Sequence, residues 1–284
     1  MDKILIRPMR SADLDFAAAC TAAEGWASET RAQLESHFAH DPSGCLIAEA
    51  DGAPLGICVA TGYGDVGFVG ELIVVPAARG RGLGRRLLDC ALEHLHAQGA
   101  RSIYLDGVVA AVPLYERAGF RKVCRSLRLA GEVTGCAVPD VRPIRPDEVY
   151  AVAALDCAAF GADRHGFLER RLRRYPELCR VAIVDGAPAG LVLGRPAGDW
   201  VSAGPWIVAP ALARPTDLIA ALLPPGTSGR IGMGILETNQ PARSAAGDLG
   251  LSEQPDPPWR MVHGPDAGLG RSLQCYAIGS AAKG

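Results

Sequence analysis

"PAARGRGLGRRLL", residues 76–88, places three glycines and four arginines at the start of what is otherwise an amphipathic helical pattern. Glycine is a poor helix former and neighbouring like charges repel, so this cluster is costly for the chain itself. The N–H groups at a helix N-terminus have no partners within the helix, and the helix dipole adds partial positive charge there. The stretch therefore predicts an anion site, where glycines let a phosphate approach the backbone and arginines add charge-assisted hydrogen bonds.

Two other phosphate motifs fit this stretch less well. A P-loop has the pattern GxxxxGK[ST], and no lysine follows the glycines here. A Rossmann turn has the pattern GxGxxG and an acidic residue about 20 residues later. Asp106 stands at roughly that distance, but Gly80, Gly82 and Gly84 are spaced GxGxG. A plain solvated helix start remains the third alternative.

The elements around this loop indicate a mixed α/β fold in which a mainly antiparallel sheet is flanked by helices. Strand 67–75 runs directly into Pro76, and the helix that follows covers about 82–98 and ends at Gly99. The other expected elements are strand 3–8, helices 11–24 and 28–39 with Ser28 as the cap of the second, strands 44–50 and 55–62 around the turn DGAP, strand 101–106, short helix 112–119 and strand 120–129.

An internal repeat divides the chain in two. LIRPMRSADLDFAAA (5–19) matches DVRPIRPDEVYAVAA (140–154), DGAPLGICVA (51–60) matches DGAPAGLVLG (185–194), and GELIVVPAAR (70–79) matches GPWIVAPALA (204–213). The three matches occur in the same order and at a nearly constant offset. We therefore expect two tandem domains of the same fold, residues 1–134 and 135–284, with the boundary near 131–139.

Composition excludes several classes of protein. The 284 residues are 49% hydrophobic and 21% charged with a net charge of −2, so no general attraction to nucleic acid or membrane is expected. No apolar run reaches the roughly 18 residues of a membrane span. Nine scattered cysteines without a CxxC pair, and no secretory leader, predict a soluble cytoplasmic protein. His94 and His96 cannot face one ligand together on a helix, and no metal site is expected.

RGRGLG, taken together with VPLYERAGF some thirty residues on, resembles the signature of the GNAT superfamily of acetyl-CoA-dependent N-acyltransferases. Arg79, Gly82 and Gly84 match its motif [QR]-x-x-G-x-[GA], and Tyr115 and the closing Gly-Phe match the second motif. The resemblance covers nearly all of residues 3–130. The repeat implies a tandem member, and the second half resembles the degenerate C-terminal acetyltransferase domain of some bacterial two-domain members.

The resemblance implies a role for each matching position. Acetyl-CoA would be the co-substrate, its pyrophosphate held by the amides of the loop Arg79, Gly80, Arg81, Gly82, Leu83 and Gly84. Backbone groups of Leu72, Ile73 and Val74 would pair with pantetheine, and one of their N–H groups would stabilise the oxyanion. Tyr115 would protonate the departing thiolate, a nearly balanced transfer between pKa values near 10 and 8.5; a packed tyrosine is its alternative. An asparagine that is frequent in the superfamily is replaced here by Val108.

The second half departs from this pattern. After WIVAP it reads ALARPTDLIAALL, with no glycines and with Pro215 where a phosphate-facing amide would be needed. We expect this half to bind no coenzyme A, and to cover the sheet of the first domain and supply substrate contacts.

Several weaker candidates concern the acceptor. Glu71, beside the thioester, is the nearest candidate for the general base, with a solvent-facing glutamate as the alternative. The candidate substrate contacts are Asp106, Trp26 and Arg164, which is followed by His165. Each has a structural alternative: a charged strand end for Asp106, core packing for Trp26 and a solvated loop for Arg164. The basic stretch RRLRRY (170–175) is interpreted as a solvated helix face rather than a nucleic-acid patch.

The sequence thus predicts an N-acetyltransferase that transfers acetyl directly to a primary amine of a small molecule or peptide, as a monomer or homodimer. A non-catalytic acyl-CoA-binding or regulatory module is the rival interpretation.

Overall fold

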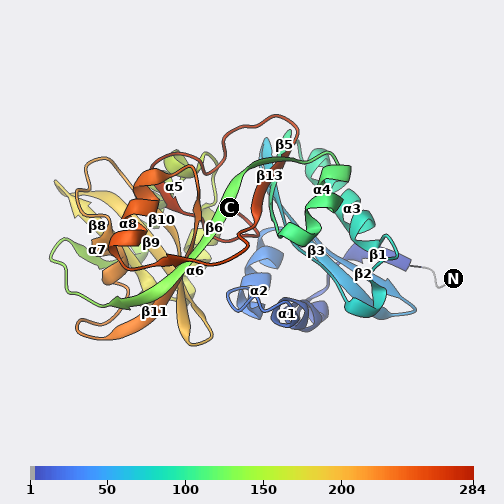
Figure 1. Cartoon of the computed structure of the whole chain (residues 1–284), viewed down its shortest axis with the longest axis horizontal. Coiled ribbons are helices and arrows are strands. Elements are labelled where there is room, and N and C mark those ends of the chain that lie inside the picture. The colour runs from blue at the N-terminus through green and yellow to red at the C-terminus, as the bar shows by residue number, and fades with distance from the viewer. Residues whose placement is uncertain (1–3) are drawn as a thin grey trace. The chain divides into compact units, whose positions relative to one another are not determined.

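The computed structural model describes residues 4–284 and divides the chain into two compact units (Figure 1). Unit 1 comprises the chain up to Val123 together with 261–267 and Lys283, and unit 2 comprises 124–260, 268–282 and Gly284. Lys3, the first residue of the expected opening strand, lies outside the described residues. In each unit a mixed sheet is flanked by helices, which confirms the predicted fold class.

Unit 1 follows the expected order of elements. They are β1 (Ile4–Pro8), α1 (Leu14–Ala23), α2 (Arg31–His40), β2 (Cys45–Ala50), β3 (Ala53–Tyr63), β4 (Val66–Val74), α3 (Leu83–Ala97), β5 (Ser102–Gly107) and α4 (Val112–Arg117), followed by β6 (Arg121–Thr134). The sheet order is β1-β2-β3-β4-β5-β13, where β13 is Trp259–His263. Ser28 is not the helix cap that was expected: α2 begins after Thr30, and the Ser28 hydroxyl donates to the Glu29 carboxylate instead.

Strand β3 shows why helices cover both faces of the unit 1 sheet. Successive side chains of a strand point to opposite faces. A Cβ at Gly56 would lie 3.3 Å from Leu87 of α3, so the missing side chain lets this helix pack closely. Ile57 and Val59 point the other way, into a core that they share with Leu14 of α1 and Leu34 of α2. Figure 1 shows α1 and α2 on one side of these strands and α3 and α4 on the other.

Unit 2 repeats this order of elements. They are β7 (Val141–Pro143), α5 (Val149–Phe160), α6 (His165–Arg174), β8 (Cys179–Val184), β9 (Ala187–Ala197), β10 (Trp200–Val208), α7 (Thr216–Ala220), β11 (Ser228–Leu236), α8 (Gln240–Asp248), β12 (Ser252–Glu253) and β14 (Cys275–Ala277). The sheet order is β6-β11-β10-β9-β8-β7, with β12 on β6 and β14 on β10. Within residues 4–284 no helix has the length and apolar character needed to cross a membrane.

The repeat extends to individual side-chain contacts. Arg7 of β1 donates to Asp13 at 2.7 Å, and Arg142, at the corresponding place in β7, donates to Glu148 at 2.7 Å. Each carboxylate also accepts a hydrogen bond from the backbone N–H three residues before it. The hydrogen bond from Arg142 lowers the pKa of Glu148 to about 2. Two copies of one ancestral unit explain why the same charged pair stabilises the same turn twice.

The boundary between the compact units differs from the boundary of the sequence repeat. The units divide inside β6, after Val123, rather than near 131–139. Most of β6 belongs to unit 2, because it pairs with β11 from Ser126–Leu236 to Thr134–Ser228. Conversely, residues 261–267 from the second half of the chain belong to unit 1, where β13 lies beside β5. Strand pairing, which the repeat does not encode, sets the boundary.

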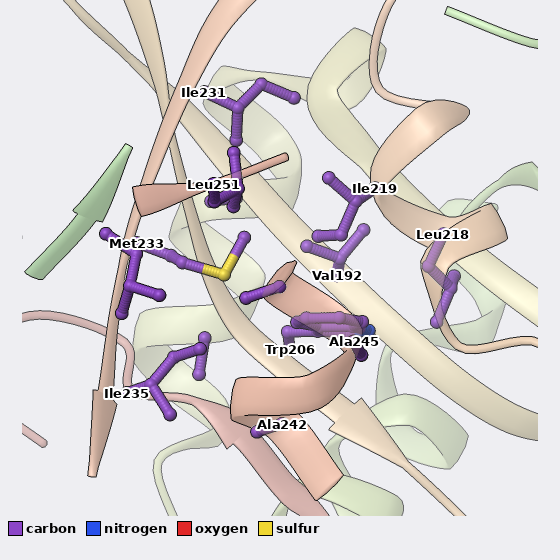
Figure 2. Close-up of a cluster of buried hydrophobic side chains, with 14 of the residues drawn as sticks. Val192, Trp206, Leu218, Ile219, Ile231, Met233, Ile235, Ala242, Ala245 and Leu251 are labelled. Atoms are coloured by element: carbon purple, nitrogen blue, oxygen red, sulfur yellow. The ribbon is translucent and has the colours of Figure 1, made fainter. Parts of the chain in front are cut away.

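The core of unit 2 is centred on Trp206 of β10, which is fully buried. Figure 2 shows Trp206 with Ala242 and Ala245 of α8 close to it and Met233 of β11 at one side. The ring of Tyr276 in β14 meets the Trp206 ring edge-on, with 5.0 Å between ring centroids. The C-terminal strand β14 is therefore an integral part of this core.

Candidate active site

Strands β4 and β5 diverge at the centre of the unit 1 sheet. They pair in parallel from Val66–Ser102 to Phe68–Tyr104, and the register ends there although β4 continues to Val74 and β5 to Gly107. The second half of β4 therefore pairs with β3 along one edge, while its other edge faces the region in which β5 has separated from it. We call this region the divergence.

Backbone alternation identifies the groups on that edge. The Val75 N–H donates to the Leu55 carbonyl on β3 at 2.9 Å. Ile73, two residues before Val75, lies opposite Ile57 of β3. In an antiparallel ladder the residues between hydrogen-bonded pairs direct their backbone groups away from the partner. Leu72 and Val74 therefore present theirs to the edge near β5, where an extended ligand with amide groups can pair with them as a strand would.

A β-bulge interrupts β4 at this place. The register with β3 shifts between Ile57 and Val59, so that Cys58 faces both Glu71 and Leu72. Glu71 has φ +50°, an uncommon conformation for a residue other than glycine and one that strains the backbone. Its side chain is only 4% exposed, so it is not the solvent-facing glutamate of the alternative interpretation.

The Glu71 carboxylate belongs to a buried cluster with Glu29 and His37. Each side chain contributes one atom that could ligate a metal, a carboxylate oxygen or an imidazole nitrogen, and these three atoms lie within 4.8 Å of one another. All three residues are buried. The Nδ1 atom of His37 lies 3.3 Å from the Thr61 hydroxyl of β3. Sequence reasoning missed Glu29 and His37, since a glutamate before a helix and a histidine in its last turn carry no motif.

The glycine loop adopts the conformation that its residue types require. Gly80 and Gly82 have φ of +75° and +76°, a region that side chains disfavour, and Gly82 is the N-cap residue of α3. The guanidinium of Arg79 donates to the Val74 carbonyl at 2.8 Å and pairs with the Glu24 carboxylate. Arg79 thus holds the loop against the end of β4, while Arg81 is exposed.

Tyr115 lies on α4 with 7% of its surface exposed. Its ring covers Gly107, where a Cβ would come within 2.9 Å of ring atoms, and it meets the Phe120 ring edge-on. Burial raises the pKa of Tyr115 above its usual value, and interaction with the buried Cys58 thiol raises the pKa further. The phenol is therefore protonated at neutral pH, as a proton donor must be.

The weaker candidates in unit 1 occupy different environments. Asp106 is half-buried in the part of β5 that has diverged from β4. Trp26 packs against the core cluster of α1, α2 and the sheet, which agrees with the alternative interpretation of Trp26 as a packing residue. Asp106 thus remains near the divergence, whereas the main contact of Trp26 is the core.

Arg164 and His165 lie in unit 2, and both have structural partners. The Arg164 guanidinium, 3% exposed, pairs with Asp156 at 2.7 Å and donates to the Gly284 carbonyl at 2.6 Å. His165 stacks on Tyr150 with 4.7 Å between ring centroids. The geometry gives Arg164 the role of a buried ion-pair residue.

Unit 2 lacks the two side chains that unit 1 places near the divergence. Gly204 and Pro205 of β10 stand where β4 has Gly70 and Glu71, and the register shift between Ala203 and Trp206 marks the corresponding bulge. After α8 the Leu251 N–H donates to the Ala246 carbonyl at 3.0 Å, as Phe120 does to Tyr115 after α4. Unit 2 thus has a proline in place of the glutamate and an alanine in place of the tyrosine.

The divergence itself is filled in unit 2. Strands β10 and β11 pair in parallel only at Val201–Ile231 and Ser202–Gly232. Beyond that point β14 pairs with β10 at Trp206–Ala277, and the Ile278 N–H donates to the Gly234 carbonyl of β11 at 2.9 Å. The protein's own chain therefore occupies the space that an extended ligand would need.

Comparison with protein families decides the classification. The model of the acetyltransferase (GNAT) family matches residues 11–120, and that of the acetyltransferase (GNAT) domain matches residues 152–277. The chain belongs to the acetyltransferase (GNAT) family and carries two GNAT domains in tandem. The first match contains β4, the glycine loop and Tyr115, so the resemblance drawn from the motifs is confirmed.

Relatives of this GNAT protein share parts of its chain. A mycothiol acetyltransferase from Streptomyces avermitilis is 41% identical over 86 residues, which are 28% of this chain and 28% of the relative. A glucosamine 6-phosphate N-acetyltransferase from Trypanosoma brucei brucei is 32% identical over 92 residues, which are 32% of this chain and 62% of the relative. The chain thus covers less than two thirds of either relative.

A solved structure resembles the GNAT protein over its whole length. The crystal structure of a putative acetyltransferase from Pyrococcus horikoshii has a TM-score of 0.83 and 22% sequence identity, and the comparison covers 99% of this chain and 96% of that chain. The tandem architecture is therefore shared with a known structure.

Proposed function

We propose that the protein transfers an acetyl group from acetyl-CoA to a primary amine of a small molecule or peptide, at a single site in unit 1. The observation that carries the proposal is the contrast between the units. Unit 1 combines a β4 edge turned toward the divergence, a glycine loop at the N-terminus of α3, and two buried ionisable side chains near the bulge. In unit 2 the corresponding space holds β14, and the glutamate and tyrosine are replaced.

The residues of unit 1 fit acetyl-CoA. Leu72 and Val74 offer backbone groups to the pantetheine amides along the β4 edge. The amides of residues 79–84 and the α3 N-terminus suit the pyrophosphate, because helix N-termini attract anions. A Cβ at Gly82 would have no heavy atom within 4 Å, so this part of the loop is open to a ligand.

The proposed proton transfers balance. Glu71 accepts the first proton of the acceptor ammonium and passes it to solvent, which leaves a nitrogen lone pair to attack the acetyl carbon. A backbone N–H of the β4 edge stabilises the oxyanion. Tyr115 donates its proton to the departing thiolate and regains one from solvent, while the nitrogen releases its second proton to solvent as the amide forms. One acetyl group is transferred and one proton is released.

A screen for thiol release tests this function. The protein is incubated with acetyl-CoA and a panel of primary amines, and free thiol is measured against controls without amine. We expect amine-dependent release, which the rival acyl-CoA-binding module would not produce. Calorimetric titration should give one acetyl-CoA per chain, and a stoichiometry of two would contradict the assignment of unit 2 as a non-binding unit.

Substitution of Gly82 tests the loop. Valine disfavours a φ of +76°, so Gly82→Val should distort the backbone that meets the pyrophosphate. We expect acetyl-CoA affinity to fall by about 2 kcal/mol, or roughly 30-fold, from the loss of charge-assisted hydrogen bonds. Gly64→Val is the matched control, because Gly64 also has φ +76° and open surroundings but lies in the β3–β4 turn. Equal affinities in the two variants would refute the role of the loop.

The cysteines support a reducing location. None of the nine forms a disulfide in the described part of the chain, and six are buried: Cys20, Cys45, Cys58, Cys124, Cys179 and Cys275. This usage is typical of a reducing compartment, and we place the protein in the cytoplasm.

A further inference from the structure

Four aromatic rings of unit 1 form a row that ends at Tyr115. In order they are His96 of α3, His263 of β13, Phe120 after α4, and Tyr115 of α4. The ring centroids of successive members lie 5.5, 5.4 and 6.0 Å apart. Ring contacts therefore link the proposed proton donor to a histidine from the second half of the chain.

His263 packs on the turn that follows α4. A Cβ at Gly119 would lie 3.3 Å from Cδ2 of the His263 ring, so the missing side chain leaves room for this ring. The Phe120 N–H donates to the Tyr115 carbonyl at 3.0 Å, which joins the turn to Tyr115 through the backbone as well. A change in the position of the His263 ring is thus transmitted to Tyr115 through Phe120.

The backbone on either side of His263 is fixed. Met261 and Val262 of β13 are fully buried, and β13 lies beside β5 in the sheet (Figure 1). Gly264 has φ +83°, and a Cβ there would collide with the Arg101 carbonyl oxygen, so the chain runs close against the start of β5. A rigid segment therefore presents the His263 ring to the turn.

This environment favours the neutral form of His263. The Nδ1 atom is buried and has no hydrogen-bond partner among residues 4–284. A neutral imidazole can leave Nδ1 without a proton, whereas the imidazolium carries an N–H there and would bury a donor without an acceptor. Burial lowers the pKa of His263, and the neighbouring His96 lowers the pKa further.

Other charged side chains on the surrounding elements have partners of their own. They are Glu116 of α4 with Lys122, Arg121 of β6 with the Gly264 carbonyl, Asp266 with Tyr104 of β5, and Arg101 with Asp65. On α3, the Nδ1 atom of His96 lies 2.9 Å from the Ala100 carbonyl oxygen. The two carboxylates closest to His263 in sequence or along α4 are thus paired elsewhere, and a proton on His263 is not compensated by them.

We propose that His263 is a positioning residue for Tyr115 and that it loses this role when it is protonated. The inference rests on the proposed function of Tyr115 as the proton donor. The neutral ring packs on Gly119 and Phe120 and keeps the Tyr115 ring in place. A proton on His263 draws the ring toward water and loosens the turn, so Tyr115 is no longer aligned with the departing thiolate.

The experiment compares His263→Ala and His263→Phe with His40→Phe. His40 is the matched control, because it is also a histidine of unit 1 in contact with another ring, that of Tyr63, but is exposed. We expect His263→Ala to lower kcat roughly 10-fold or more, because a small misplacement of a catalytic group is enough for such a loss. KM and acetyl-CoA affinity should stay within about threefold of wild type. His263→Phe keeps a ring and should retain most of kcat at neutral pH.

The pH dependence separates positioning from simple packing. Between about pH 7.5 and about pH 5.5 the wild-type kcat should fall about threefold more than that of His263→Phe, which has no proton to accept. Any loss that comes from Glu71 is common to both proteins. A base whose pKa is lowered by folding gives its full stabilisation above its unfolded value of about 6.5 and loses it as pH falls. Urea unfolding should therefore show the wild type losing more stability than His263→Phe over the same interval.

A double-mutant cycle with Tyr115→Phe identifies the residue through which His263 acts. His263→Ala should have little further effect on kcat when Tyr115 has already lost its hydroxyl. An equal loss in both backgrounds would overturn the inference, because a general structural defect acts with or without the hydroxyl. The same conclusion follows if wild type and His263→Phe respond identically to pH, a comparison that decides the matter if His263→Ala does not fold.

Ultraviolet titration tests the inference without turnover. The absorbance difference between each protein and its Tyr115→Phe variant reports the Tyr115 phenolate. Burial raises the pKa of Tyr115, so a loosened ring in His263→Ala should ionise at a lower pH than in the wild type. Unchanged ionisation would overturn the inference, whereas absence of thiol release with every amine would refute the proposed function alone.

Discussion

Tyr115→Phe should lower kcat roughly 100-fold or more and leave acetyl-CoA affinity within a few fold, because general acid catalysis typically contributes that much. The substitution keeps the ring that covers Gly107 and contacts Phe120, and removes only the hydroxyl proton. The effect is expected in turnover rather than in binding, since the proton is needed when the thiolate departs.

The pH profile gives this prediction a second readout. A group that must be protonated makes the rate fall as pH rises through its pKa. Burial raises the pKa of Tyr115, so the basic limb of the wild type should lie above the usual tyrosine value of about 10. The phenylalanine variant should lose that limb.

Tyr104→Phe is the control for Tyr115→Phe. Tyr104 is also buried, on β5, and its hydroxyl donates to Asp266 at 2.9 Å. This variant should retain wild-type kcat. If Tyr115→Phe turns over within about threefold of wild type, Tyr115 is a packing residue and solvent protonates the thiolate, whose conjugate acid has a pKa near 8.5.

Glu71→Gln should lower kcat/KM for the best amine roughly 100-fold or more at neutral pH, the usual contribution of a positioned base. Glutamine preserves the shape of the side chain at the bulge and removes its ability to accept a proton. The variant then depends on amine that is already unprotonated in solution. Its kcat/KM should therefore rise tenfold per pH unit until the pKa of the amine, a slope that the wild type should not follow.

The strained backbone at Glu71 makes the bulge sensitive to substitution. Thermal unfolding and acetyl-CoA titration of Glu71→Gln therefore check that the variant is folded and binds the co-substrate. Glu35→Gln is the surface control, because Glu35 lies on α2 and pairs with Arg31 at the surface. Near-normal kcat/KM in a folded Glu71→Gln protein would exclude Glu71 as the base and direct attention to His37 and Asp106.

Local sequence was sufficient for most elements of unit 1 and for the backbone conformation of the glycine loop. Gly99 and Gly119 end helical segments with positive φ, as the sequence predicted, and α3 begins within one residue of the expected place. These features depend on neighbours along the chain, because glycine alone tolerates such backbone conformations and the 3.6-residue period marks the buried helix face. The cap at Ser28 was wrong, because Thr30 has the extended backbone that precedes α2.

The candidate site was only partly predictable. Tyr115 and the loop 79–84 were predicted as site residues from two short motifs, because each motif is contiguous in the sequence. Glu29 and His37 meet Glu71 only after α2 packs on the sheet, so no spacing rule could identify them. Arg164 was a candidate substrate contact with a solvated loop as the alternative, whereas in the structure it is buried and binds Asp156 and the Gly284 carbonyl.

The sequence by itself determined that the chain contains two copies of one α/β unit and that only the first carries the glycine loop. Tertiary structure alone decided where three strands pair: β6 with β11, β13 beside β5, and β14 inside the divergence of β10 and β11. The physical reason is that a strand's pattern encodes which of its faces is buried, whereas its backbone hydrogen bonds are the same for any partner edge. The choice of edge depends on how the whole chain packs.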